Sequence, residues 1–464
     1  MFSSKIYQNR RDLLRSKIGK GIILFPGNTE VAMNYRANTY RFRPDSNFLY
    51  FFGLDQPDLF GIMDIDNNED ILFADDIDIE DIIWMGNLPS VTDRAAKAGI
   101  NKTSRMKDIR VFIENAIAQN RPIHYIFPYR GETVLQLQSL LSCSTEVMKQ
   151  NTSEELSVAI CQLRSVKSAE EITELDAITD VAGLMHTTAM RMAQAGMTER
   201  EIAGTIEGIA LSKGVGTSFP VILSKHGEIL HNHEHGNVLN TGDLLVVDAG
   251  AESTRFYASD ITRTCPIGGK FSQKQKEIYE IVLAANISAI EMSKPGVYYR
   301  DVHLNAARVI AEGLKSLGLM KGDMSEAVAR GAHALFFPHG LGHMLGLDVH
   351  DMENIGEKYV GYDNTVSRSD QFGLAYLRMA KKLEEGFVMT DEPGIYFIPA
   401  LIDNWKAENK FGEFINYNLV ETYKGFGGIR IEDDILITAN GCRILGKPIP
   451  KTVAEVESIT AKGI

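Results

Sequence analysis

The chain has few cysteines and no long apolar run. Its four cysteines are widely spaced and form no CxxC pair (Cys143, Cys161, Cys265 and Cys442). The sequence therefore predicts neither a disulfide framework nor a thiolate metal site, and it favours a reducing compartment. No apolar run reaches the roughly 20 residues that cross a bilayer, and segment 1–21 has no apolar core of signal-peptide length. We therefore expect a cytoplasmic protein without a membrane partner.

Positive charge is also scarce. Lys and Arg number 48 against 61 Asp and Glu, for a formal net charge of −13. Binding to a phosphate backbone needs clustered Lys and Arg, so a nucleic-acid partner is not expected. The hydrophobic fraction of 44% and the charged fraction of 23% are typical of a globular protein. At 464 residues the chain is too long for one ordinary core, which predicts two domains.

We place the two domains at residues 1–160 and 161–464. In the first, segments 21–27 (GIILFPG) and 48–54 (FLYFFGL) are short apolar runs ended by Gly or Pro, as strands are. Just after the boundary, Ser168 followed by Glu171 is a capping-box pattern that predicts the start of a long helix.

A second capping pattern, Thr198 with Glu201, predicts another helix that ends near Gly214. The segments that begin at Ala195 and Pro295 share a weak repeat, in which a Gly is followed by an Arg, an acid and a β-branched residue. The repeat fits two halves, each with helices followed by strands, around a shared cleft. That order predicts an α+β fold rather than alternating βαβ units.

Titratable groups gather in segment 339–351, HGLGHMLGLDVHD, which holds three histidines, two aspartates and three glycines. Four other segments each place an acid on or beside an apolar, strand-like run: LLVVDAG, YASDITRT, TDEPGIYF and GIRIEDD, with Asp248, Asp260, Glu392 and Glu432. Any one such acid usually caps a turn or faces solvent. Four of them beside apolar strands are harder to explain in this way, because buried unpaired charge is costly.

With His343, these acids form an oxygen-rich ligand set with one imidazole. Such a set suits Mn²⁺, Co²⁺ or Fe²⁺ better than a structural zinc ion. Converging carboxylates raise each other's pKa unless cations neutralise them. Two divalent ions roughly 3.5–4 Å apart would do so and would activate a shared water. Gly340 and Gly342 make a helix unfavourable between His339 and His343, so we expect one of these histidines as a ligand and not both.

At these residues the chain resembles the metallopeptidase family that contains aminopeptidase P, prolidase and methionine aminopeptidase. The resemblance runs from about Arg164 to Ile459 and covers five segments in order: DAG, SDITRT, HGLGHMLGLDVHD, EPGIYF and GIRIEDD. It implies a pita-bread (creatinase/aminopeptidase) fold for the C-terminal domain. It also implies that Asp248 chelates one metal, Asp260 and Glu432 bridge two metals, and His343 and Glu392 bind the other.

The resemblance implies further roles around the metals. His231 corresponds to a histidine that lines the substrate site. His339 and His350 correspond to the pair that contacts substrate and stabilises the tetrahedral intermediate, and Arg430 to an arginine that helps orient substrate. Glu392 would also pass a proton to the leaving nitrogen. We expect His233 and His235 to be loop residues beside the site.

Segment 40–54, YRFRPDSNFLYFFGL, resembles the smaller α/β creatinase-like N-terminal domain of aminopeptidase P and prolidase. Methionine aminopeptidases lack that domain. The resemblance therefore implies hydrolysis of the bond between an N-terminal residue and a following proline in peptide substrates. It further implies two divalent metal ions, with Mn²⁺ first and Co²⁺, Fe²⁺ or Zn²⁺ as alternatives, and a homo-oligomer (dimer or tetramer).

Two members of the family stay open. Insertions at 353–383 and 399–424 resemble those of prolidases, which cleave dipeptides. Prolidases of that style place an arginine in the second insertion to hold the substrate carboxylate, whereas this chain aligns Phe411 there, beside Lys410. We therefore favour aminopeptidase P, with prolidase as the alternative and an inactive binding scaffold as a remote one. Asp391 also departs from the family, which usually has an apolar residue there; it could change the charge near Glu392 or turn outward.

Overall fold

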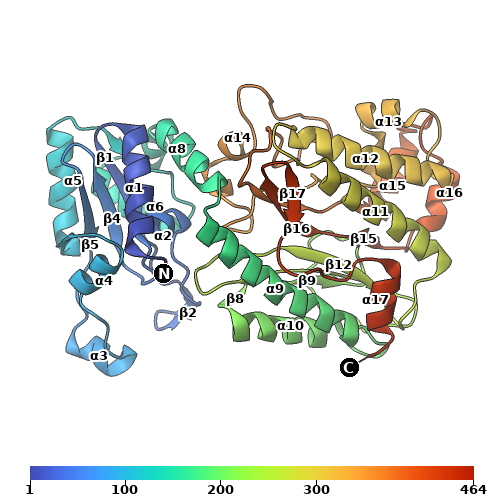
Figure 1. Cartoon of the computed structure of the whole chain (residues 1–464), viewed down its shortest axis with the longest axis horizontal. Helices are drawn as coiled ribbons and strands as arrows, with labels where there is room; N and C mark the ends of the chain where they lie inside the picture. Colours follow the sequence, from blue (N-terminus) through green and yellow to red (C-terminus); the bar gives the residue numbers. More distant parts are fainter. Residues whose placement is uncertain (464) are drawn as a thin grey trace. The chain divides into compact units, whose positions relative to one another are not determined.

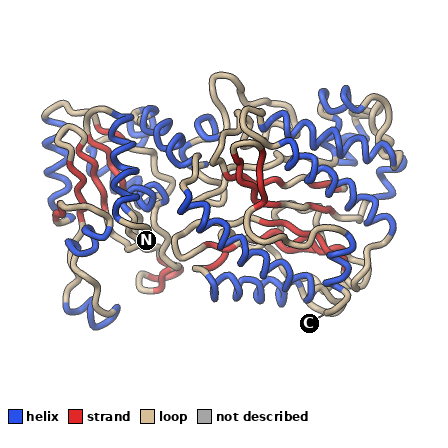
Figure 2. Tube along the Cα trace, in the orientation of Figure 1, coloured by secondary structure: helices blue, strands red, loops and turns tan. Residues whose placement is uncertain are grey.

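The computed structural model describes residues 1–463. It divides into two compact units, which are drawn in Figures 1 and 2. The first comprises Met1–Arg164 and Asn354–Tyr359, and the second comprises Ser165–Glu353 and Val360–Ile464. Among the described residues, none of the helices combines the length and hydropathy needed to cross a membrane. No disulfide joins the cysteines within this part of the chain.

The first unit contains a five-stranded mixed sheet in the order β6-β5-β4-β1-β7. The strands are β1 (Ile22–Pro26), β4 (Phe60–Asp64), β5 (Glu69–Phe73), β6 (Lys102–Ser104) and β7 (Ile123–His124), and a separate pair is formed by β2 (Ala32–Tyr35) and β3 (Asn38–Thr39). β4 pairs antiparallel with β1 and β5, whereas β6 and β7 pair parallel at the two edges.

Helices also belong to this unit, wholly or in large part. They are α1 (Ser4–Ile18), α2 (Ser46–Phe52), α3 (Ile79–Met85), α4 (Val91–Lys97), α5 (Ile109–Ala118), α6 (Gly131–Leu141), α7 (Thr145–Gln150), α8 (Glu154–Ser165) and α14 (Glu357–Val360), with the 3₁₀ turns η1 (Met106–Asp108) and η3 (Glu353–Ile355). Buried residues of α5 and α6, Ile113 and Leu137 among them, pack against Ile62 and Ile71 of the sheet and close one core. The unit is thus an α/β domain, as expected.

One predicted strand is wrong. Segment 21–27 does form β1, but segment 48–54 lies in and just after helix α2. Asp45 caps this helix by accepting hydrogen bonds from the backbone N–H groups of Asn47 and Phe48, and Gly53 ends it with a φ of 68°. Every residue of α2 is buried, and its residues 48–52 are all aromatic or aliphatic, so this run has no polar face from which the helical period could be read.

The second unit contains two helix-then-strand halves, as the weak repeat predicts. The first half has α9 (Ala169–Met192) and α10 (Glu199–Lys213), followed by the antiparallel sheet β12-β10-β9. The second half has α11 (Gln273–Met292) and α12 (Tyr299–Ser316), followed by the antiparallel sheet β13-β16-β17. Figure 1 shows the two helix pairs on opposite sides of the strands.

The strands of this unit are β8 (Gly216–Thr217), β9 (Ile222–Ser224), β10 (Leu244–Ala249), β11 (Ala251–Glu252), β12 (Ile261–Pro266), β13 (Val388–Asp391), β14 (Gly394–Tyr396), β15 (Gly428–Arg430), β16 (Asp433–Thr438) and β17 (Gly441–Ile444). Its remaining helices are α13 (Met324–Arg330), α15 (Pro399–Ala407), α16 (Tyr417–Val420) and α17 (Val453–Thr460), with η2 (Ala332–Leu335) and η4 (Glu421–Tyr423). Helices with antiparallel strands make an α+β fold, which confirms the predicted class.

The predicted helix starts are confirmed. Ser168 and Glu171 form a complete capping box at the start of α9, and Thr198 and Glu201 form another at α10. Gly214 is the residue that ends α10. These signals are local, because each is complete within three or four residues of sequence.

Candidate active site

Strand pairing brings the four predicted acids to one place. Asp248 lies in β10, opposite Thr262 of β12, and Asp260 comes just before β12. Strand β13 pairs with β16 so that Asp391 faces Asp433, which carries Glu392 and Glu432 to the same end of that ladder. The backbone N–H of Glu432 donates to the Thr262 carbonyl at 3.0 Å and joins the two halves of the unit.

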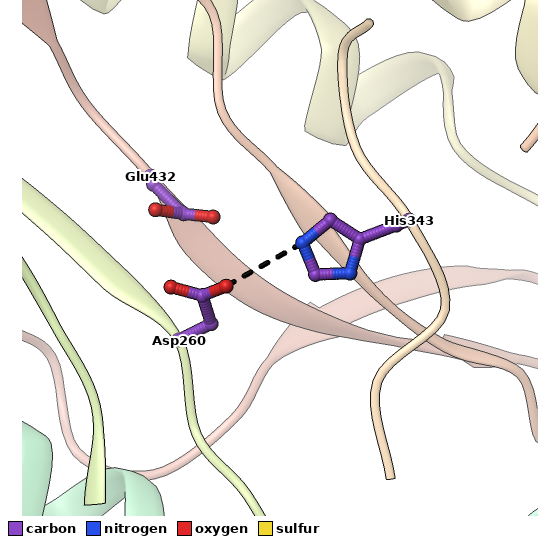
Figure 3. Close-up of side chains that lie close together, drawn as sticks. All are labelled: Asp260, His343 and Glu432. Carbon is purple, nitrogen blue, oxygen red and sulfur yellow. Dashed lines mark ion pairs between the residues drawn. The ribbon is translucent and has the colours of Figure 1, made fainter. Parts of the chain in front are cut away.

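A cavity of about 510 Å³ lies at this junction, and it is lined by every predicted site residue: His231, Asp248, Asp260, His339, His343, His350, Glu392, Arg430 and Glu432. In Figure 3 the carboxylates of Asp260 and Glu432 face each other, with the ring of His343 beside them. One ligand atom from each of these three residues lies within 4.8 Å of the others. The Nε2 atom of His343 is 3.4 Å from Asp260 and 3.7 Å from Glu392.

The predicted setting of Glu432 needs correction. Its alternation with Ile429 and Ile431 predicts a half-buried strand, but it lies between β15 and β16 and is only 1% exposed. Successive residues of both neighbouring strands are buried, apart from Thr438 at the end of β16, so both faces of these strands are covered. A carboxylate there is an interior group, so it needs a partner that an ordinary surface acid does not.

His343 is oriented as a metal ligand would be. Segment 339–345 is not helical, as predicted, and it runs beside β13, where the N–H of Thr390 donates to the carbonyl of His343. A Cβ on Gly342 would lie 2.1 Å from the Thr390 carbonyl oxygen, so glycine is required. The Nδ1 atom of His343 lies 3.0 Å from the Met344 carbonyl, which leaves the Nε2 lone pair facing the carboxylates.

The buried carboxylates of the cavity are not all matched by cationic side chains. Within residues 1–463, one buried oxygen of Asp248 and one of Asp260 have no hydrogen-bond partner. Burial raises the pKa of Asp260 well above its usual range, and Asp248 raises it further. Burial and Asp260 do the same to the pKa of Glu432, and burial raises the pKa of Glu392 to about 6. This donor set therefore fits external cations, and oxygen ligands with one imidazole suit divalent metals.

A directional hydrogen-bond chain supports one wall of the cavity. Arg430 donates to Asp248 at 2.6 Å, to Thr262 at 3.1 Å and to the hydroxyl of Tyr396 at 2.8 Å. That hydroxyl lies 2.9 Å from the Nε2 atom of His339. Each of the three guanidinium nitrogens of Arg430 thus donates to a protein group, and the side chain also lines the cavity. Tyr396 was not among the predicted residues, although it stands four residues after Glu392 in EPGIYF.

His350 has a partner that the sequence reasoning also missed. Its Nδ1 atom lies 2.6 Å from the carboxylate of Glu353, which in turn pairs with Arg378. Burial and the neighbouring His343 lower the pKa of His350 to about 2, so the free protein holds this ring neutral. With its proton shared with Glu353, the ring offers Nε2 as an acceptor, and donation to an oxyanion would need a second proton.

The remaining histidines differ in position. His231 and His233 both line the cavity, whereas the Nδ1 atom of His235 lies 3.0 Å from the Leu223 carbonyl. Asp391 does not turn outward: it is buried, and it accepts a hydrogen bond from the side-chain amide of Asn286 at 3.0 Å. The alternative that Asp391 faces solvent is therefore wrong.

Phe411 and Lys410 point to aromatic neighbours. The ring centroids of Phe411 and Trp405 are 5.5 Å apart, and the ammonium of Lys410 lies 4.4 Å from the Trp405 centroid. Neither Lys410 nor Phe411 is among the described residues that line the cavity. Lys410 therefore does not take the place of the prolidase arginine at the cavity.

Comparison with known families gives two matches. Residues 174–439 match metallopeptidase family M24, and residues 7–125 match the aminopeptidase P N-terminal domain. The first match covers all four acids and His343, and it ends seven residues after Glu432.

Individual proteins are similar over nearly the whole chain. The human Xaa-Pro dipeptidase is 30% identical over 95% of this chain and 88% of its own length. A probable Xaa-Pro aminopeptidase of Ajellomyces dermatitidis is 32% identical over 90% of this chain and 88% of its own. Among solved structures, a variant of Escherichia coli aminopeptidase P in complex with substrate superposes with a TM-score of 0.81 and 30% identity over 99% of both chains. The Pseudomonas aeruginosa aminopeptidase PepP gives a TM-score of 0.82 at 28% identity, over 99% of this chain and 98% of its own. The chain therefore belongs to metallopeptidase family M24, in its aminopeptidase P and prolidase group, with an aminopeptidase P-type N-terminal domain before a pita-bread domain.

Proposed function

We propose that this protein is a dinuclear-metal-dependent Xaa-Pro aminopeptidase of the aminopeptidase P type. It would hydrolyse the bond between an N-terminal residue and a following proline in peptides of three residues or more. The observation that carries the proposal is the convergence of Asp248, Asp260, His343, Glu392 and Glu432 on one cavity with an excess of buried negative charge. Within the proposal, residues 1–160 form the N-terminal domain and residues 161–464 the catalytic domain.

These five residues would hold two divalent ions. Asp248 would bind one ion, Asp260 and Glu432 would bridge the pair, and His343 and Glu392 would bind the other. Mn²⁺ is the first choice for this donor set, with Co²⁺, Fe²⁺ and Zn²⁺ as alternatives. When bound, such ions lower the pKa of a shared water and polarise the substrate carbonyl.

The remaining residues of the cavity would handle the substrate. Glu392, whose carboxyl has a raised pKa, can carry a proton to the nitrogen of the leaving proline. His231, His339 and His350 would contact the peptide, and Glu353 fixes the ring of His350. Arg430 would keep Asp248 and Tyr396 in place. A tertiary Xaa-Pro amide offers no N–H, which fits a site that reads the first residue and the ring.

Prolidase activity is the second candidate, and the identity to the human Xaa-Pro dipeptidase favours it. The residue at position 411 argues against it. A dipeptide carries its carboxylate on the proline, within the cavity, where it needs a cation. Phe411 and Lys410 instead pack against Trp405. An inactive scaffold is a remote third candidate, because it would not require four converging buried acids.

We further propose a homo-oligomer, a dimer or tetramer, in the cytoplasm. Its substrates would be peptides with proline in the second position, and no nucleic acid is expected as a partner because the net charge is −13.

The test combines metal analysis with two substrates. Purified protein, loaded with Mn²⁺ and desalted, should retain about two ions per chain if both ions bind tightly. It should cleave Ala-Pro-Gly with a kcat/KM at least ten-fold above that for Ala-Pro. A ten-fold preference corresponds to a difference of roughly 1.4 kcal/mol in free energy. Preference for Ala-Pro would establish prolidase activity instead, and loss of all metal on desalting with no turnover would establish the scaffold.

A further inference from the structure

Two aromatic side chains at the cavity are much more exposed than its acids. Phe372 and Tyr376 line the cavity and are 38% and 60% exposed, whereas Asp260 and Glu432 are buried. Exposed aromatic rings at the rim of a cavity are typical of a recognition surface, because they bind apolar groups at little entropic cost. These two rings therefore stand at the outer side of the cavity.

The chain holds this aromatic wall rigidly. Backbone N–H groups of Leu374 and Ala375 donate to the Gln371 carbonyl at 2.9 and 2.8 Å, which closes a turn. Gly373 has a φ of 93°, and a Cβ there would lie 2.6 Å from the Cβ of Ala334, so the turn packs tightly against η2. The ring of Phe372 packs edge-on against Trp405, with centroids 5.9 Å apart.

The other end of the turn is fixed by core packing. Leu377, directly after Tyr376, is buried in a small cluster with Tyr362, Val366 and Ala380. The hydroxyl of Tyr362 also donates to the Leu377 carbonyl. Tyr376 is thus presented by an anchored turn rather than by a free loop.

The cationic side chains that line the cavity are already paired with carboxylates of the protein. The two arginines that line the cavity are Arg378 and Arg430, and each is paired with a carboxylate, Glu353 and Asp248 respectively. A carboxylate placed against Phe372 and Tyr376 would lose its hydration without gaining a matched partner. An apolar side chain placed there would instead bury apolar surface on both partners.

We infer that Phe372 and Tyr376 form a subsite for the third residue of the peptide, the one directly after proline, and that this subsite selects apolar and aromatic side chains. The inference rests on the proposed aminopeptidase P activity. Such an enzyme holds the N-terminal residue at the metal centre, so the residues after proline leave towards the exposed side of the cavity. That side carries the two rings.

The experiment measures kcat/KM for Ala-Pro-Phe, Ala-Pro-Gly and Ala-Pro with the full-length, metal-loaded protein. The wild type should prefer Ala-Pro-Phe over Ala-Pro-Gly by about ten-fold, the lower range for a side chain that fills an apolar pocket. F372A and Y376A should each reduce this ratio several-fold, mainly through KM, and the double variant should bring it to about one. Y376F should keep the ratio, since the ring and not the hydroxyl makes the contact.

L211A is the matched control, because Leu211 is 64% exposed on α10 and does not line the cavity in the described structure. It should keep the wild-type ratio. Since Tyr376 is mostly exposed, Y376A and Y376F carry the test even if F372A fails to fold.

The outcomes separate the two proposals. Cleavage of both tripeptides at equal kcat/KM, or a ratio that Y376A leaves unchanged, would overturn the subsite and leave aminopeptidase P activity in place. An effect of Y376A on the choice between Ala-Pro-Gly and Phe-Pro-Gly alone would also overturn it, because the rings would then contact the first residue. Cleavage of Ala-Pro only would overturn both.

Discussion

Glu432 and Asp433 are neighbours in sequence and equally buried, yet their electrostatic surroundings are opposite. Although burial acts to raise it, Arg263 and Lys451 lower the pKa of Asp433 to about 2. The carboxylate of Asp433 lies 2.7 Å from Arg263 and 2.6 Å from Lys451. The carboxylate of Glu432 accepts a hydrogen bond from the neutral hydroxyl of Thr262 at 2.6 Å, and its pKa is raised by burial and by Asp260.

The difference distinguishes a structural acid from a ligand. The chain supplies buried cations for Asp433, as it must if the group is to stay charged in the interior. Within residues 1–463 neither Asp260 nor Glu432 forms an ion pair with a Lys or Arg, and Arg430 lowers the pKa of Glu432 by less than burial raises it. The charge of this pair must therefore be neutralised by protons or by ions from solution. Successive side chains of an extended segment point to opposite faces, which is why adjacent acids can meet such different surroundings.

The largest expected effect comes from a change to Glu392, one of the acids that line the cavity. E392Q should reduce kcat on Ala-Pro-Gly by about 10³-fold or more, because a ligand charge and a proton carrier are lost together. The exposed acid Glu385 provides the matched control, and E385Q should have wild-type activity. Turnover by E392Q above a tenth of the wild-type rate would contradict the role assigned to Glu392.

The paired acid should matter more for stability than the unpaired one. D433N should lower the free energy of unfolding by about 3–5 kcal/mol, because it removes the carboxylate that forms ion pairs with Arg263 and Lys451 in the interior. In metal-free protein, E432Q should cost much less or should stabilise, since it removes repulsion from Asp260. Chemical denaturation of both variants in the presence of a chelator makes the comparison, and equal losses would refute it.

Metal removal should act on the cavity cluster alone. At a free Mn²⁺ concentration of about 100 times Kd, the ions should stabilise the folded protein by about 3 kcal/mol per site relative to chelated protein. Thermal unfolding with and without chelator measures this effect. D433N should show the same metal-dependent increment, whereas D260N should show little. An increment that survives in D260N would place the ions elsewhere.

The unpaired acids also set the sign of a pH effect. Burial raises the pKa of Glu392 from 4.5 to about 6, so the folded state binds this proton more tightly than the unfolded state. The stability that protonation provides is complete below pH 4.5 and is lost as the pH rises through 6. Measured in chelator, the stability of the wild type relative to E392Q should therefore fall between these values. A rise over this interval would be the wrong sign.

Glu353 is intermediate between the cavity acids and the structural acid Asp433. It lies beside the cavity, but it has a cationic partner in Arg378. Both side chains are about one-third exposed, so solvent screens the pair. E353A should lower kcat by about three- to ten-fold with little change in KM, because His350 loses the acceptor that orients it. E353Q keeps an acceptor and should lose less. Equal losses in the two variants would argue that charge, not orientation, is what Glu353 provides.

The sequence predicts features that are complete within a few residues. The capping boxes at Ser168 and Thr198 are of this kind, and so are strand β10, which carries Asp248, and strand β12, which begins directly after Asp260. Segment 48–54 was predicted wrongly because an apolar run buried on all sides has no period, and only Asp45 and Gly53 mark it as a helix. Tyr396 and the wall of Phe372 and Tyr376 were not predicted, since their partners are distant in sequence. Glu353 was missed although it stands only three residues after His350.

By itself the sequence determined the inventory of this protein: the α+β class, the family, and the acids and histidine able to bind metal. It could not decide, within the run of three acids at 432–434, which one faces the cavity and which one is neutralised. That depends on Arg263 and Lys451, which lie 170 residues before and 18 residues after Asp433. Only the folded chain brings these cations to one carboxylate and withholds them from the next, and in a buried setting that difference separates a structural ion pair from a site for external cations.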